Sequence, residues 1–140
     1  MNFLNLETIG RSSFSIRLSK GRKEKYTIFL RPGLHEFLES ASQEWELVVF
    51  TAAEQEYADL ILKQIDPQRL YFSERLYRQH CRPTSEGFTK YLSDVQDRRY
   101  EDCILVDDNE TNFQANPNHV IPILPFTEED ELDCELYCLK

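Results

Sequence analysis

The sequence predicts an α/β fold in which a parallel sheet is flanked by helices and a short β insertion lies near the N-terminus. Short apolar runs that suit buried strands alternate along the chain with segments of helical period, the pattern of a parallel sheet. Hydrophobic residues make up 41% of the 140 residues, enough for the core of one domain. No apolar run approaches the roughly 20 residues that a membrane span needs. We therefore expect one domain over residues 1–140, with 127–140 as an acidic C-terminal helix or tail.

The strands are predicted from alternation or from short apolar runs. Gly21 marks a turn between the second and the third strand, and the continuous apolar run Leu47–Phe50 is typical of a strand covered on both faces. The expected strands are residues 2–9, 13–18, 26–30, 47–50, 70–72, 103–106 and 121–123.

The helices are predicted from apolar spacing and from proline. Arg31-Pro32-Gly33 opens the first helix, since proline suits the first helical turn, and the second helix ends before Pro67. The third segment is a weak helical turn. The expected helical segments are residues 34–43, 53–65 and 90–95.

Polar residues follow the predicted strands where ligands of parallel sheets bind, outside the carboxyl ends. They are Thr51, Lys90 and the pair Asp107-Asp108. A hydroxyl and a lysine can hold an anionic oxygen, and adjacent carboxylates can hold Mg²⁺, so the set suits a phosphate ester. Each residue also has a purely structural interpretation: a helix cap for Thr51, a surface position for Lys90 and an Asx turn for the aspartates.

Several short motifs resemble those of one family. In chain order they are Leu30-Arg31-Pro32-Gly33 with Phe37-Leu38, Val49-Phe50-Thr51-Ala52 with Tyr57-Ala58-Asp59, Arg75-Leu76-Tyr77-Arg78 with Cys81, Phe88-Thr89-Lys90 with Leu92-Ser93, Ile104-Leu105-Val106-Asp107-Asp108, and Asn116-Pro117 with Val120-Ile121-Pro122. They resemble the FCP/SCP homology domain, also called NLI-interacting-factor-like, of the CTD phosphatases in the HAD superfamily. The resemblance runs from about Asn2 to Phe126.

The resemblance implies a HAD-like fold and assigns roles to the residues at the strand ends. In the family, the threonine corresponding to Thr51 and the lysine corresponding to Lys90 bind the phosphoryl group. The pair corresponding to Asp107-Asp108 helps to hold Mg²⁺.

One family motif, DxDx[TV], is degenerate in this chain. The alignment places Leu4 and Leu6 at its two catalytic aspartates, and leucine has neither a lone pair for attack nor a proton to transfer. On a strand, Asn5 and Glu7 would point to the opposite side and could not replace them. Tyr91 stands where the family usually has an aspartate after the lysine, which puts the positioning of that lysine in question.

These departures favour a catalytically inactive phosphatase domain that acts as a binding or structural subunit of a protein complex. Such a domain needs no cofactor, and Mg²⁺ is the metal expected if one binds. An active Mg²⁺-dependent protein Ser/Thr phosphatase is the first alternative. The others are a domain like that of a mitochondrial translocase receptor and a degenerate domain that only packs against others.

The charge pattern bears on partners and on location. Residues 27–140 hold 10 basic and 23 acidic residues, a net charge of −13, which disfavours nucleic acid as a direct partner. We expect protein partners, with a phosphoprotein among the candidates, and leave the oligomeric state open. Four cysteines without paired CxxC spacing indicate reduced thiols inside the cell, so nuclear, cytoplasmic and mitochondrial locations all stay open.

Three further features have structural interpretations. Trp45 is expected in the core or at its rim, and Cys134 and Cys138, one helical turn apart, fit a packed face better than a metal site. The acidic segment 128–135 is interpreted as a solvated helix end, with the binding of a basic partner as the alternative.

Overall fold

A computed structural model describes residues 13–19, 24–127 and 133–139. Its strands are β1 (Ser13–Arg17), β2 (Lys25–Phe29), β3 (Leu47–Phe50), β4 (Phe72–Leu76), β5 (Arg82–Thr84), β6 (Gly87–Thr89), β7 (Leu105–Asp107) and β8 (Val120–Pro122). Its α-helices are α1 (Leu34–Glu44), α2 (Gln55–Ile65) and α3 (Glu110–Ala115). Four 3₁₀ turns lie at Arg78–His80, Leu92–Asp94, Tyr100–Asp102 and Tyr137–Leu139. Within these residues no helix is both long enough and apolar enough to cross a membrane.

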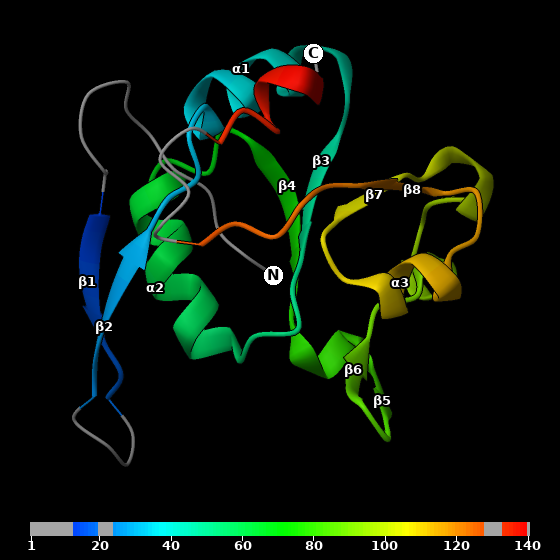
Figure 1. The fold of residues 1–140 in the computed structure, drawn as a ribbon, viewed down its shortest axis with the longest axis horizontal. Coiled ribbons are helices and arrows are strands. Elements are labelled where there is room, and N and C mark those ends of the chain that lie inside the picture. Colours follow the sequence, from blue (N-terminus) through cyan, green and yellow to red (C-terminus); the bar gives the residue numbers. More distant parts are fainter. Residues whose placement is uncertain (1–12, 20–23, 128–132, 140) are drawn as a thin grey trace.

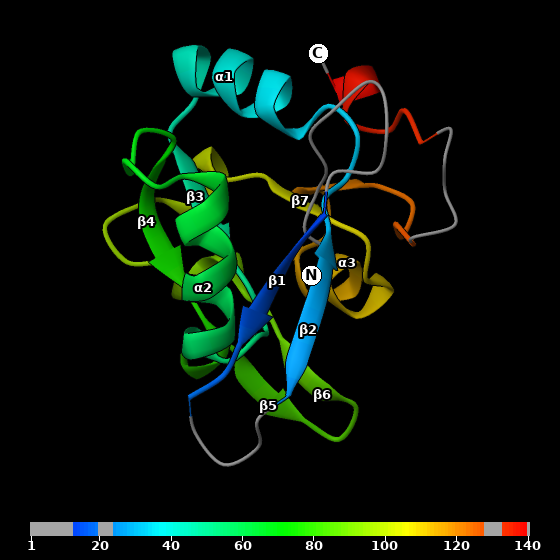
Figure 2. The same cartoon turned by 90° about the vertical axis from the view of Figure 1, so that its left-hand side faces the viewer.

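The main core lies where an antiparallel hairpin packs on helices. β1 and β2 pair in register, with Ser13 opposite Phe29 and Arg17 opposite Lys25, which is the predicted β insertion. The hairpin lies along α2, with α1 across one end (Figures 1 and 2). The buried side chains of this core are Ile16, Ile28, Leu30, Leu34, Leu38, Ile61, Ile65 and Leu136.

The parallel strands form two separate pairs in the described part of the chain. β3 pairs with β4, and β7 pairs with β8. The single sheet expected from the sequence is therefore an assembly of small parallel sheets flanked by helices. β3 and β7 each have a second edge that no described strand pairs.

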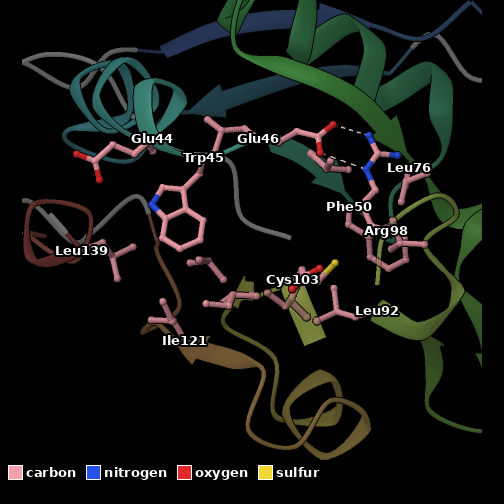
Figure 3. A pocket seen from close by; sticks show the side chains of 18 of the residues that line it. Glu44, Trp45, Glu46, Phe50, Leu76, Leu92, Arg98, Cys103, Ile121 and Leu139 are labelled. Carbon is pink, nitrogen blue, oxygen red and sulfur yellow. Dashed lines mark hydrogen bonds and ion pairs between the residues drawn. The ribbon is translucent and has the colours of Figure 1, made fainter. Parts of the chain in front are cut away.

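A cavity of about 480 Å³ separates the two parallel pairs. Trp45, Ile121 and Leu139 surround one end of it, and Arg98 and Glu46 are joined at the other (Figure 3). Trp45, after the end of α1, is 61% exposed, so it belongs to the rim of this cavity and not to the core.

Most predicted elements exist with shifted bounds. β1, α1 and β3 lie where the sequence placed them, whereas α2 starts two residues later, at Gln55. β4 and β7 are displaced toward the C-terminus and carry Leu76 and Asp107 at their ends. The hairpin β5–β6 and the helix α3 were not predicted, because strands of three residues and a helix of six are too short for a clear period. The strand predicted over residues 2–9 lies outside the described residues.

The C-terminal turn, residues 133–139, is docked on the body of the domain. Leu136 is only 1% exposed and belongs to the main core. The carboxylate of Asp133 binds the fully buried guanidinium of Arg31 at 2.7 and 2.9 Å, so this acid is not solvated as expected. Cys134 and Cys138 are exposed, so the prediction that they form a packed face is wrong.

Candidate functional site

Thr51 follows the last residue of β3 and is fully buried. Its N–H donates to the carbonyl oxygen of Leu76 at 2.9 Å, which extends the β3–β4 ladder by one residue. Its hydroxyl oxygen accepts the N–H of Ala53 at 3.0 Å. Because α2 starts only at Gln55, Thr51 fixes a turn after the strand. The interpretation of Thr51 as a helix cap is therefore wrong.

Lys90 and Asp107 form a buried ion pair. Lys90 follows β6, Asp107 ends β7, and the lysine Nζ lies 2.5 Å from Oδ2 of the carboxylate. Each side chain is 2% exposed, so the surface position considered for Lys90 is wrong. Each charge therefore finds its counter-charge within the protein, which is how a buried ionised group is usually tolerated.

The charged form of Asp107 is the favoured one. Burial alone would raise the pKa of this carboxyl, but three interactions outweigh it and lower the pKa below its ordinary value. They are the charge and hydrogen bond of Lys90, the N–H of Asn109 at 2.8 Å and the side-chain amide of Asn112 at 3.1 Å. The contact with Asn109 is the Asx turn that the sequence allowed.

Two asparagines, one in α3 and one at its C-terminal end, hold the backbone around Lys90 in place. The side-chain oxygen of Asn112 accepts the N–H of Lys90 at 3.0 Å. The amide of Asn116 donates to the carbonyl oxygen of Lys90 at 2.8 Å, and its oxygen accepts the N–H of Leu92 at 2.8 Å. Both asparagines are at most 3% exposed. Asn112 in α3 and Asn116 at its C-cap are four residues apart, a helical spacing that is visible in the sequence.

Cys81 contacts Thr51 and lies within the electrostatic influence of the ion pair. This buried thiol lies 3.7 Å from the carbonyl oxygen of Thr51. Burial raises the pKa of the Cys81 thiol, the charge of Lys90 lowers it and that of Asp107 raises it, so the thiol feels both members of the pair. The three predicted residues Thr51, Lys90 and Asp107 are thus all buried. The hydroxyl of Thr89, next to the lysine, is also buried, without a hydrogen-bond partner among the described residues.

Tyr91 does not face the ammonium of Lys90 as the replaced aspartate was expected to do. Its ring lies 4.0 Å from the guanidinium of Arg82, a cation–π contact. Arg82 in turn binds Asp94 through two nitrogens at 2.6 and 2.7 Å. Lys90 is held instead by Asp107, Asn112 and Asn116. It is therefore well positioned although the next residue is a tyrosine and not an aspartate.

The described residues do not present a ready ligand set for Mg²⁺. Both carboxylate oxygens of Asp107 already accept hydrogen bonds from the protein. Asp108 is half-buried next to it, and no group of three or more His, Cys, Asp or Glu residues suited to a metal occurs within the described part of the chain. Leu4 and Leu6 lie outside the described residues.

The comparisons with known proteins agree on one family. A family model described as NLI interacting factor-like phosphatase matches residues 4–140. The CTD nuclear envelope phosphatase 1 homolog of Caenorhabditis elegans is 33% identical over 129 residues, which cover 91% of this chain and 52% of that protein. Nuclear envelope morphology protein 1 of Schizosaccharomyces pombe is 34% identical over 98 residues, which cover 70% of this chain and 20% of that protein.

A solved structure shows the same fold. The structure of Fcp1, described as an essential RNA polymerase II CTD phosphatase, superimposes with a TM-score of 0.68 and 28% identity over 83% of this chain. The matched part covers 32% of the Fcp1 chain. The chain thus spans between a fifth and about half of the proteins it resembles here.

Proposed function

The chain belongs to the NLI interacting factor-like phosphatase family, and we propose that it is a member without phosphatase activity that works as a binding or structural subunit of a protein complex. The names of the relatives given above refer to phosphatases or to the nuclear envelope. They support a function related to that of this phosphatase family, and they offer nothing in favour of the mitochondrial alternative.

The ion pair of Lys90 and Asp107 is the observation that carries the proposal. A lysine that binds a phosphoryl oxygen must offer its charge to the ligand, and a carboxylate that binds Mg²⁺ must offer an oxygen to the metal. At 2.5 Å and 2% exposure, each group instead neutralises the other. Phosphate or Mg²⁺ would have to break a buried charge pair before it could bind.

The aligned positions of the catalytic motif support the same conclusion. In our alignment Leu4 and Leu6 replace the nucleophile and the general acid–base of the family. Removing the nucleophile alone in another covalent catalyst lowers the rate by about 10⁶-fold. We propose that Thr51 and Lys90 are what remains of the phosphate site, and that Asp107 and Asp108 hold Mg²⁺ weakly or not at all.

An active Mg²⁺-dependent protein Ser/Thr phosphatase is the second candidate. Its support is that Lys90 contacts Asp107 and that Thr51, at the end of a neighbouring parallel strand, is buried as they are. This candidate requires a nucleophile that the present alignment does not provide.

The deciding experiment is a phosphatase assay on the purified chain with para-nitrophenyl phosphate and a phosphoserine peptide, with and without Mg²⁺. We expect no turnover above a sample of Asp107→Asn prepared in the same way, since any remaining rate would come from contaminants. Turnover that depends on Mg²⁺, disappears with chelator and is absent from Asp107→Asn would refute the proposal and establish the second candidate.

A further inference from the structure

The C-terminal turn presents two thiols away from the candidate site. Cys134 and Cys138 are both exposed, whereas Cys81 is buried and Cys103 is half-buried. The N–H of Cys138 donates to the carbonyl oxygen of Cys134 at 3.2 Å, so the two residues are one helical turn apart on the same side. The neighbouring Cys134 side chain, together with the charges of Glu135 and Asp133, raises the pKa of the Cys138 thiol.

The other side of this turn is fixed to the domain. Leu136, between the two cysteines, is inserted in the main core, and Asp133, just before them, binds the buried Arg31. The N–H of Leu124 also donates to the carboxylate of Glu135 at 3.1 Å. The turn therefore separates a docked face from a face that carries the thiols.

The two cysteines are close enough in the chain to form a disulfide, but the bond would require a change in the shape of the turn. Residues four apart on a helix have their β-carbons about 5–6 Å apart. A disulfide requires about 3.5–4.5 Å between β-carbons, less than this spacing, so forming the bond would change the shape of the turn. Leu136 and Asp133 hold the turn in its present shape, so closing the bond competes with docking. Exposed disulfides that form against such resistance are easily reduced.

We propose that Cys134 and Cys138 are a site of reversible oxidation, at which a small-molecule disulfide such as glutathione disulfide drives formation of an intramolecular disulfide. The thiolate of one cysteine attacks glutathione disulfide, breaks its S–S bond and expels one glutathione thiolate. The second cysteine thiolate then attacks the protein sulfur of the mixed disulfide and expels the second glutathione. Two protein thiols are oxidised, one glutathione disulfide is reduced to two glutathione molecules, and the two protons of the cysteines pass to the departing thiolates.

Oxidation and docking of the turn are then linked. If the docked turn disfavours the bond, the bond disfavours docking by the same factor. A change that weakens docking must therefore favour oxidation. This relation distinguishes a built dithiol site from two cysteines that merely happen to be exposed.

The test equilibrates the full chain with glutathione buffers of increasing oxidised fraction, quenches it with acid and measures intact mass and peptide maps. We expect the loss of two hydrogen atoms, located between Cys134 and Cys138, with little glutathione adduct at these residues. Cys134→Ser and Cys138→Ser should each instead keep one glutathione adduct, about tenfold more abundant than in the unmodified chain. Cys103→Ser is the matched control and should oxidise as the unmodified chain does.

The linkage is tested with Leu136→Ala and with the milder Leu136→Val, in case the larger change unfolds the domain. Both should raise the oxidation equilibrium constant, Leu136→Ala by about tenfold, a typical size for coupling between two sites. Stable adducts at both cysteines, or a disulfide that uses Cys81 or Cys103, would overturn the dithiol site. An oxidation constant that does not change in either Leu136 variant would overturn its link to docking.

Discussion

Lys90 and Asp107 form an ion pair in the interior of the protein. Removing one partner leaves an uncompensated buried charge, whereas removing both leaves only a change of shape. The surrounding asparagines fix the geometry: Asn112 contacts both the carboxylate of Asp107 and the backbone of Lys90. The pair is therefore a structural element of the fold whatever its role in chemistry, and its energetics can be measured separately from activity.

We expect Asp107→Asn to lower the free energy of unfolding by about 3–5 kcal/mol at neutral pH, because it leaves Lys90 buried and unpaired. Lys90→Met should cost a similar amount. The double variant should be more stable than the sum of the single losses predicts, which urea unfolding of all four proteins would show as a double-mutant cycle. Additive losses would mean that the two groups do not interact, contrary to the 2.5 Å contact.

The lowered pKa of Asp107 predicts how this effect depends on pH. A carboxyl with a pKa lower in the folded than in the unfolded state stabilises the fold above its unfolded pKa, about 3.9 for aspartate. The stabilisation is lost as the pH falls through the lower, folded value. The difference in stability between the unmodified chain and Asp107→Asn should thus be constant above about pH 5 and shrink below about pH 4. Unfolding curves at several pH values measure it, and a difference that grows on acidification would contradict the assignment.

Elements that depend on local sequence patterns could be predicted from the sequence, whereas long-range contacts could not. α1 could be predicted because its apolar face and the preceding Pro32 are local signals. β3 could be predicted because a run of four apolar residues is also a local signal. The burial of Lys90 could not be predicted in this way, since its partner lies 17 residues away. The docking of the C-terminal turn depends on Arg31 and Asp133, which are 102 residues apart. Thr51, Lys90 and Asp107 were found by motif, but not the contacts that hold them.

The start of α1 offers a test of how the C-terminal turn is docked. Gly33 caps the helix with a φ of +82°, where a side chain is strained, and a β-carbon there would lie 2.8 Å from Cζ of Tyr137. Gly33→Ala should lose about 1–2 kcal/mol from the backbone alone and a further 1–3 from the clash with the ring. Urea unfolding would measure this loss.

Tyr137→Ala separates the two contributions. In that background Gly33→Ala should cost only the backbone part. Gly87→Ala is the matched control, because its φ is +126° and no atom lies within 4 Å of the added carbon. Its cost should be the same with or without the tyrosine ring. Equal costs for Gly33→Ala in both backgrounds would show that Tyr137 is not against the start of the helix.

The fold brings together residues that come from four separate segments of the chain. Thr51 follows β3, Lys90 follows β6, Asp107 ends β7, and the asparagines come from α3 and its C-cap, so the site depends on the whole arrangement of the domain. β3 and β7 each keep an edge that no described strand pairs, and the cavity of about 480 Å³ lies between them. A fold similar to that of Fcp1, in which Lys90 and Asp107 neutralise each other, fits the proposed role in binding.

The proposed alignment, together with this arrangement, predicts the effect of placing aspartates at positions 4 and 6. In the unmodified chain, low-millimolar Mg²⁺ should hardly change the melting temperature, because both oxygens of Asp107 are engaged. Leu4→Asp with Leu6→Asp would add two carboxylates, and Mg²⁺ at a hundredfold excess over its Kd would then stabilise the protein by about 2.7 kcal/mol. Leu4→Asn with Leu6→Asn has side chains of the same size without the charge and should show little of this gain.

Hydrolysis of para-nitrophenyl phosphate by the aspartate double variant should stay weak even with Mg²⁺. Lys90 and Asp107 must first separate before one can bind phosphate and the other the metal, and breaking this buried pair costs several kcal/mol. Each 1.36 kcal/mol that has to be spent in this way lowers the rate about tenfold. If Mg²⁺ neither stabilises the aspartate variant more than the asparagine variant nor elicits turnover, Leu4 and Leu6 do not stand at the catalytic positions and the alignment of the motif is wrong.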